Sequence, residues 1–128
     1  RYLFRYFALQ VLYLQAKKRQ LMNKPFTYEQ AEEICEDFEY LVDTELAIDG
    51  VQHYIDHVII VPFSTADQAL FMQSYREAGN MLPALDNYTG DQYDVIIIAS
   101  KMQDINDITT IDIRKYIEDN GVSYNFPR

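Results

Sequence analysis

Two short runs of hydrophobic residues stand out in the second half of the chain. Val58–Val61 and Val95–Ile98 consist entirely of valine and isoleucine, and a polar residue precedes each run. Continuous apolar runs of this length are typical of strands that are buried on both faces, as in parallel sheets. The pattern therefore predicts two neighbouring central strands.

Helical periodicity surrounds these two runs. Ala31, Ile34 and Phe38 follow helical spacing, and Thr27 with Gln30 has the spacing of a capping box. A second helix is expected to begin at Ser64 or Thr65 and to end near Gly79, and a third to run from Thr109 or Thr110 to Gly121. A weaker extended segment is expected at 82–88, and the tail at 122–128 is a candidate edge strand.

This order of elements predicts an α/β fold. We expect a small, mainly parallel sheet with flanking helices, preceded by an N-terminal helical pair. The turn signal Asp49-Gly50 divides the chain into a helical segment, residues 1–50, and an α/β domain, residues 51–128.

The segment at 1–20 is apolar almost all round, so a helix formed there needs cover on several sides. A single small core covers only one face of such a helix, and we therefore expect a homo-oligomer, most simply a dimer. The candidate interface residues are Tyr2, Phe4, Tyr6, Phe7 and Tyr13.

Charge is distributed unevenly over the 128 residues. The net charge is −9, yet residues 1–24 contain six basic residues and none of the 20 acidic ones. The acidic remainder disfavours direct contact with DNA, which we expect only through other domains of a longer protein. The first residue is arginine, which suggests that the chain is an excised piece.

The single Cys35 excludes an internal disulfide and a multi-cysteine metal site. It suits a reducing compartment, so a cytoplasmic location is expected. No apolar run approaches the roughly 18 residues that a membrane helix needs, and no membrane contact is expected.

Candidate chemistry is sparse. Ser64 and Thr65 begin a predicted helix, where backbone N–H groups can hold an anion, and Lys101 follows the second strand. The simpler interpretation of both hydroxyl residues is capping. His53 and His57 have the i, i+4 spacing of a helical zinc site, but His57 directly precedes a strand and no third ligand is identifiable. We predict no catalytic residue, no metal and no cofactor.

The order HVIIVPFSTADQALF, LPALDNYTGDQYDVIIIAS and DITTIDIRKYIED resembles a phosphotransferase-system enzyme IIB domain, over residues 57–120. Degenerate domains of this kind form the carboxyl-terminal part of Mga/AtxA-type transcription regulators. The family's active-site cysteine would fall at 62–65, where this chain has Pro-Phe-Ser-Thr, so phosphocysteine chemistry is expected to be absent.

The resemblance implies a non-catalytic regulatory and oligomerisation domain of a bacterial transcription regulator. Two alternatives from other classes stay open. One is a small cytoplasmic enzyme or sensor that binds an anion or ligand through Ser64, Thr65 and Lys101. The other is an adaptor whose acidic helix binds a basic protein, through Glu32, Glu33, Glu36, Asp37, Glu39 and Asp43.

Overall fold

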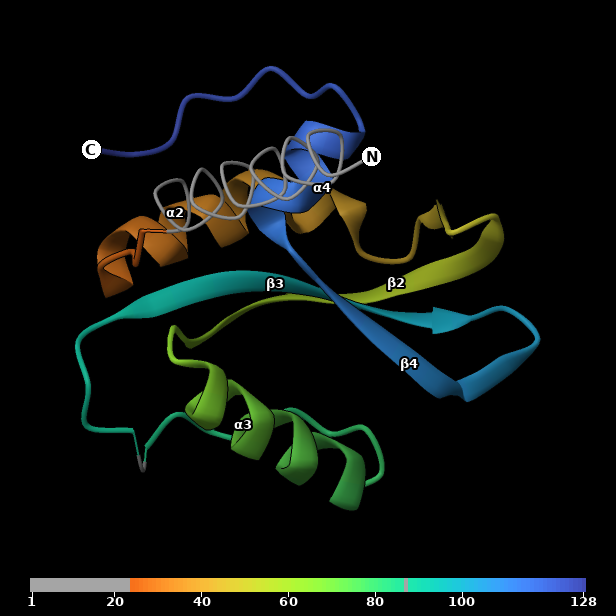
Figure 1. The fold of residues 1–128 in the computed structure, drawn as a ribbon, viewed down its shortest axis with the longest axis horizontal. Helices are drawn as coiled ribbons and strands as arrows, with labels where there is room; N and C mark the ends of the chain where they lie inside the picture. Colours follow the sequence, from red (N-terminus) through yellow and green to blue (C-terminus); the bar gives the residue numbers. More distant parts are fainter. Residues whose placement is uncertain (1–23, 87) are drawn as a thin grey trace, which may run out of the picture.

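A computed structural model describes residues 24–86 and 88–128 of the chain. Its centre is a four-stranded sheet with the strand order β1-β2-β3-β4, in which every neighbouring pair is antiparallel. The strands are β1 (Glu45–Ile48), β2 (Val51–Pro62), β3 (Tyr93–Lys101) and β4 (Asp104–Asp112). Figure 1 shows a strongly twisted sheet, with β4 crossing in front of β2 and β3 in this view.

Helices cover both faces of the sheet. The helices α2 (Tyr28–Phe38) and α4 (Ile113–Asp119) lie on one face, here called the α2 side, with the short 3-10 helix η1 (Glu39–Leu41) following α2. The helix α3 (Thr65–Glu77) lies on the other face, the α3 side (Figure 1). Within the described residues, no helix is both long enough and apolar enough to cross a membrane.

Two hydrophobic clusters fill the space between the sheet and its helices. On the α2 side, Val95 and Ile97 of β3 pack with residues of α2 and α4. On the α3 side, Ile96 and Ile98 pack with residues of α3. Because successive side chains of a strand point to opposite faces, β3 contributes to both clusters and is buried along almost its whole length.

The two apolar runs are neighbouring central strands, as predicted. Val58 lies opposite Ile97, and Val61 lies opposite Asp94. The prediction of a mainly parallel sheet is wrong, because β3 begins beside the end of β2, with Pro62 opposite Tyr93, and runs back along it. Apolar runs without alternation arise here because helices cover both faces of an antiparallel sheet.

The prediction of an N-terminal helical pair is also wrong. In the described part of the chain, α2 is the one α-helix that precedes the sheet. The segment after α2 forms η1 and β1, and β1 pairs with β2 through a hairpin whose turn contains Asp49 and Gly50. Both turn residues have positive φ, as a tight hairpin turn requires. The expected boundary between residues 50 and 51 therefore falls inside a hairpin.

The capping residues predicted from the sequence mark the starts of α2 and α3 correctly. Thr27 and Gln30 form the capping box of α2, with the Thr27 Oγ1 accepting from the Gln30 N–H at 3.2 Å. Ser64 is the N-cap of α3, and Gly79, at φ 66°, follows its C-cap. Gly79 adopts the left-handed conformation that commonly ends a helix.

The region 104–112 differs from its prediction. Thr109 and Thr110 belong to β4 rather than to a helix, and α4 begins only at Ile113, capped by the Asp112 side chain. No strand forms at 82–86 or at 122–128. The tail instead packs on α2, where the Tyr124 ring meets the Phe38 ring edge-on at 4.8 Å.

Replacing Ile97 by Asp is expected to remove a large part of the free energy of unfolding, because this side chain is fully buried beneath α2 and α4. An unpaired buried carboxylate costs about 3–5 kcal/mol, and small domains are stable by only about 5–15 kcal/mol. Leu70→Asp is the matched control, since Leu70 on α3 is 62% exposed.

Urea denaturation followed by circular dichroism measures both variants. We expect Leu70→Asp to change the free energy of unfolding by less than about 1 kcal/mol. An Ile97→Asp protein that unfolds cooperatively at the same urea concentration as the control would place the core elsewhere.

Candidate functional site

A polar recess of about 660 Å³ opens on the α3 side of the sheet. Ten residues line it, including two carboxylates and a histidine, and none of the ten is lysine or arginine. We call this hollow the polar recess. The lining residues with polar side chains are Asp43, Tyr54, Asp56, His57, Tyr75, Asn80, Ser100 and Asn106. They come from the segment before β1, from β2, from the end of α3 and from the β3–β4 hairpin.

A β-bulge in β2 shapes the recess. Ile55 lies opposite Ala99 and His57 lies opposite Ile98, so Asp56 is an extra residue without a partner. Side chains alternate along a strand, and without the bulge His57 would point to the same side as Ile55. The bulge turns His57 to the α3 side instead, where its ring meets the Tyr75 ring edge-on at 5.9 Å.

Burial raises the pKa of the Tyr75 hydroxyl, and the nearby Asp56 carboxylate raises it further. Tyr75 therefore stays neutral at physiological pH and is available as a hydrogen-bond donor. Ser100, which is only 3% exposed, adds another hydroxyl to the lining of the polar recess.

Two residues of the polar recess have left-handed backbones. Asp43 has φ 69° and Asn80 has φ 66°, a conformation that few residues other than glycine adopt. The Asp43 N–H donates to the Ile55 carbonyl at 2.8 Å, and the Asn80 N–H donates to the Tyr75 carbonyl at 2.9 Å. The first bond fixes the segment before β1 beside the bulge, and the second closes the last turn of α3.

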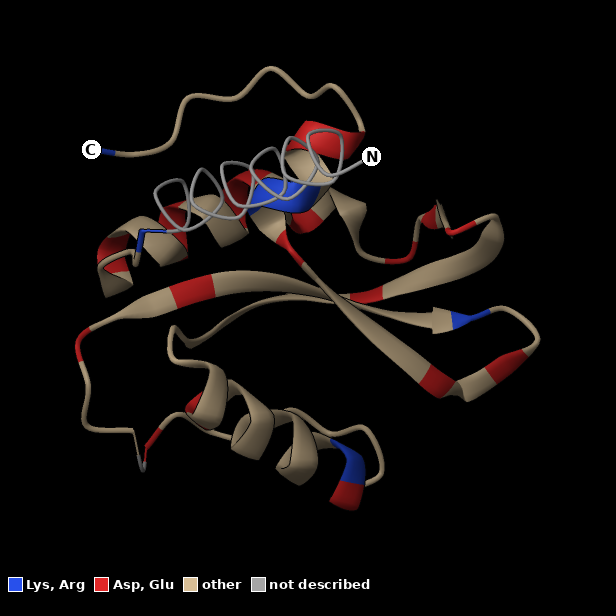
Figure 2. Ribbon diagram, viewed as in Figure 1, with Lys and Arg blue, Asp and Glu red and all other residues tan. Residues whose placement is uncertain are grey.

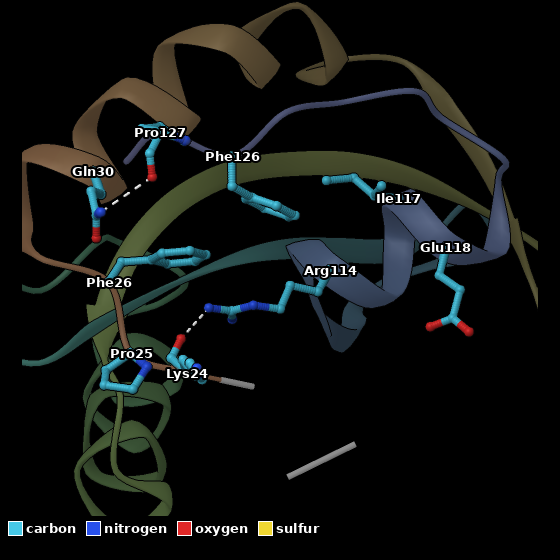
Figure 3. Close-up of a pocket in the computed structure, with 9 residues that line it drawn as sticks. All are labelled: Lys24, Pro25, Phe26, Gln30, Arg114, Ile117, Glu118, Phe126 and Pro127. Atoms are coloured by element: carbon cyan, nitrogen blue, oxygen red, sulfur yellow. Dashed lines mark hydrogen bonds between the residues drawn. The ribbon is translucent and has the colours of Figure 1, made fainter. Parts of the chain in front are cut away.

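A second hollow, with a volume of about 490 Å³, lies on the α2 side (Figure 3). We call it the Arg114 groove; its walls are Phe26, Ile117, Phe126 and Pro127, with Arg114 across it. Gln30 Nε2 donates to the Pro127 carbonyl at 3.2 Å and so holds the tail against α2.

The Arg114 guanidinium connects three parts of the fold. It lies 3.8 Å from the centre of the Phe26 ring and donates to the Lys24 carbonyl. On its other side, Nη1 lies 2.9 Å from Asp94 Oδ1 and 3.7 Å from Asp112 Oδ1. Arg114 therefore fastens the segment before α2 to β3 and to the start of α4.

Burial raises the pKa of Asp94 to about 8, with a further contribution from Asp112, although Arg114 and the Val95 N–H oppose the shift. Two carboxylates share one guanidinium here, and retaining one proton avoids a second negative charge in a buried place. The charged group of the Arg114 groove is thus already paired within the protein, and the open part of the groove is apolar.

The possible anion loop of Ser64, Thr65 and Lys101 is not assembled, and the simpler interpretation of Ser64 as a helix cap is confirmed. The Ser64 Oγ accepts from the Asp67 N–H at 3.1 Å and donates to the Asp67 carboxylate at 2.7 Å, so it serves in capping. Thr65 is the first residue of α3. Lys101 pairs with Asp107 at 2.7 Å.

Since Pro62 pairs with Tyr93 while Lys101 pairs with His53, Ser64 and Lys101 lie at opposite ends of the sheet. The expected interface residues Tyr2, Phe4, Tyr6, Phe7 and Tyr13 lie outside the described part of the chain.

The two histidines do not share a helical face, because both lie in β2. His53 is 3% exposed, and its Nδ1 lies 2.8 Å from the Val51 carbonyl oxygen. Alternation places His53 on the side of Ile55, whereas the bulge turns His57 to the α3 side. In residues 24–86 and 88–128, no group of three or more His, Cys, Asp or Glu side chains is placed to hold a metal ion.

Sequence reasoning did not find the polar recess. Its residues are far apart in the chain and meet only through the antiparallel pairing and the bulge. The one usable signal was the polar stretch before Val58, which is unusual inside a strand and marks a half-exposed, irregular part of β2.

Comparison of the chain with protein-family models, with curated proteins and with solved structures gave no significant match.

We expect the domain to lose stability as pH rises from about 4 to about 8. Asp94 has a folded-state pKa of about 8 against an ordinary value of 3.8, so the folded state binds more protons in this window. This contribution is fully present below pH 4 and is lost as pH passes the folded-state pKa. Urea titrations at several pH values measure it.

Asp94→Asn is the matched variant, because an amide keeps the shape and the oxygen acceptor but does not ionise. It is expected to flatten the dependence of the free energy of unfolding on pH between 5 and 8. An unchanged pH dependence in Asp94→Asn would contradict the assignment of this titration to Asp94.

Proposed function

We propose that this chain is a non-catalytic regulatory and self-associating domain of a bacterial transcription regulator, located in the cytoplasm. One observation supports the first part of this proposal: Cys35 is held as an unreactive thiol, Ser64 is engaged in capping α3, and Lys101 is paired with Asp107. DNA contact would come from other domains of the full-length protein.

Cys35 illustrates this. It lies half-buried on the packed stripe of α2, and burial, with Glu32 and Glu36, raises the pKa of its thiol to about 12. The thiolate is the reactive form, so the fraction available at neutral pH is very small. Ser64 is used in capping α3, and Lys101 is paired and distant from it. The anion-binding alternative therefore has no assembled site in the described residues.

Self-association rests on the apolar sequence of residues 1–23, which lie outside the described part. The dimer stays a prediction, and light scattering of the unmutated chain tests it. A monomer at high protein concentration would remove this part of the proposal.

The adaptor alternative retains one supporting observation. Figure 2 shows acidic residues along α2, and the side chains of Glu29, Glu32, Glu33, Glu36, Asp37 and Glu39 are all exposed. A basic protein is attracted to such a surface, although its affinity for exposed charges falls as salt rises. A solvated helix face explains the same pattern, so we retain the regulatory domain as the main proposal.

We expect no transfer of phosphate to this chain from a phosphotransferase cascade. The chain is incubated with phosphoenolpyruvate and the general phosphotransferase proteins, and intact-mass spectrometry follows it. A cascade substrate with its active-site cysteine intact is the positive control. A mass increase of one phosphoryl group, mapped to Cys35, Ser64 or Thr65, would contradict the non-catalytic assignment.

A further inference from the structure

We propose that the polar recess binds a small organic ammonium ligand, with Asp43 and Asp56 contacting its positive charge and the ring of Tyr54 contacting its carbon chain. This inference deepens the proposed regulatory role by naming the class of ligand that would act as its input. It differs from the anion-binding alternative, which rested on Ser64, Thr65 and Lys101.

The backbone brings the two carboxylates to the same rim. The Asp43 N–H donates to the Ile55 carbonyl, and the Ile55 N–H donates to the Thr44 carbonyl at 2.9 Å. The residue after Ile55 is Asp56, the extra residue of the bulge. Asp43 and Asp56 are therefore held beside each other by two backbone hydrogen bonds, and both line the polar recess.

The end of α3 adds a negative potential to the same place. Tyr75, Gly79 and Asn80 line the polar recess, and they form the last turn of this 13-residue helix and the residues after it. The carboxyl end of a helix behaves as a partial negative charge and favours cations. None of the ten lining residues is lysine or arginine, so the permanent side-chain charges are the carboxylates of Asp43 and Asp56. Both favour a positive ligand.

The remaining lining suits an organic cation rather than a bare metal ion. Tyr54, which is 40% exposed, supplies aromatic surface, which attracts ammonium groups. The buried Ser100 and the amide of Asn80 supply neutral hydrogen-bonding groups. Metal ions of biological sites need several anionic or imidazole ligands, and no such group of three is present in the described residues. The volume of about 660 Å³ fits a small molecule.

The test is a titration of the whole chain with 1,4-diaminobutane, followed by ¹H–¹⁵N NMR. We expect saturable shifts at the amides of Asp43, His57 and Asn80, with a dissociation constant on the order of 1 mM. The uncharged analogue 1,4-butanediol has the same chain length, and we expect it to bind at least about fivefold more weakly.

Two substitutions assign the binding to the polar recess. Asp56→Asn removes one carboxylate, and Asp43→Asn removes the other while keeping a residue that tolerates the left-handed backbone. Each is expected to weaken diamine binding about fivefold or more. Asp119→Asn is the matched control, because it removes the same charge from an exposed residue of α4, on the opposite face of the sheet, and should leave binding unchanged.

Three results would overturn the proposal. They are the absence of saturable shifts at about 50 mM diamine, an equal response to the diol, and an equal loss of binding in Asp119→Asn. If Asp56→Asn does not fold, Asp43→Asn and the diol comparison decide the matter. None of these results depends on the phosphotransferase experiment, so failure here leaves the non-catalytic assignment intact.

Discussion

The antiparallel pairing of β2 with β3 is the interaction on which the rest of the structure depends. It joins the two apolar runs, from Val58 opposite Ile97 to Pro62 opposite Tyr93. Their side chains alternate between the two hydrophobic clusters, so the same strands hold α2 and α4 on one face and α3 on the other. A shift of one residue in this register would exchange the side chains of the two faces.

The same constraint explains how a polar recess persists beside a hydrophobic core. Residues on both sides of Asp56 are paired with β3: His53 to Ile55 before it and His57 to Pro62 after it. Removing the bulge would therefore require a change of register along one of these two stretches. Bulges commonly redirect side chains next to functional sites. Here the bulge turns His57 towards Tyr75 and leaves Asp56 beside the segment that carries Asp43. The site is thus a consequence of strand register.

Local features of the fold could be predicted from the sequence, and long-range features could not. Capping by Thr27 and Ser64 and the positions of the central strands depend on neighbouring residues. The direction of β3 depends on the path of the chain through residues 78–92, which no local pattern specifies. Thr109 has the side chain of a helix cap, yet its pairing with Ala99 places it in β4. The polar recess required both the direction and the bulge. Ser64 and Lys101 lie at opposite ends of the sheet because the strands are antiparallel, whereas parallel strands would place both at one end.

Cross-strand NOE contacts between β2 and β3 test this account most directly. In the antiparallel register, we predict contacts between Val58 and Ile97 and between Val61 and Asp94, together with a break in the pattern at Asp56. Contacts between Val58 and Asp94 and between Val61 and Ile97 would instead indicate parallel strands. That result would contradict the fold and the recess built on it.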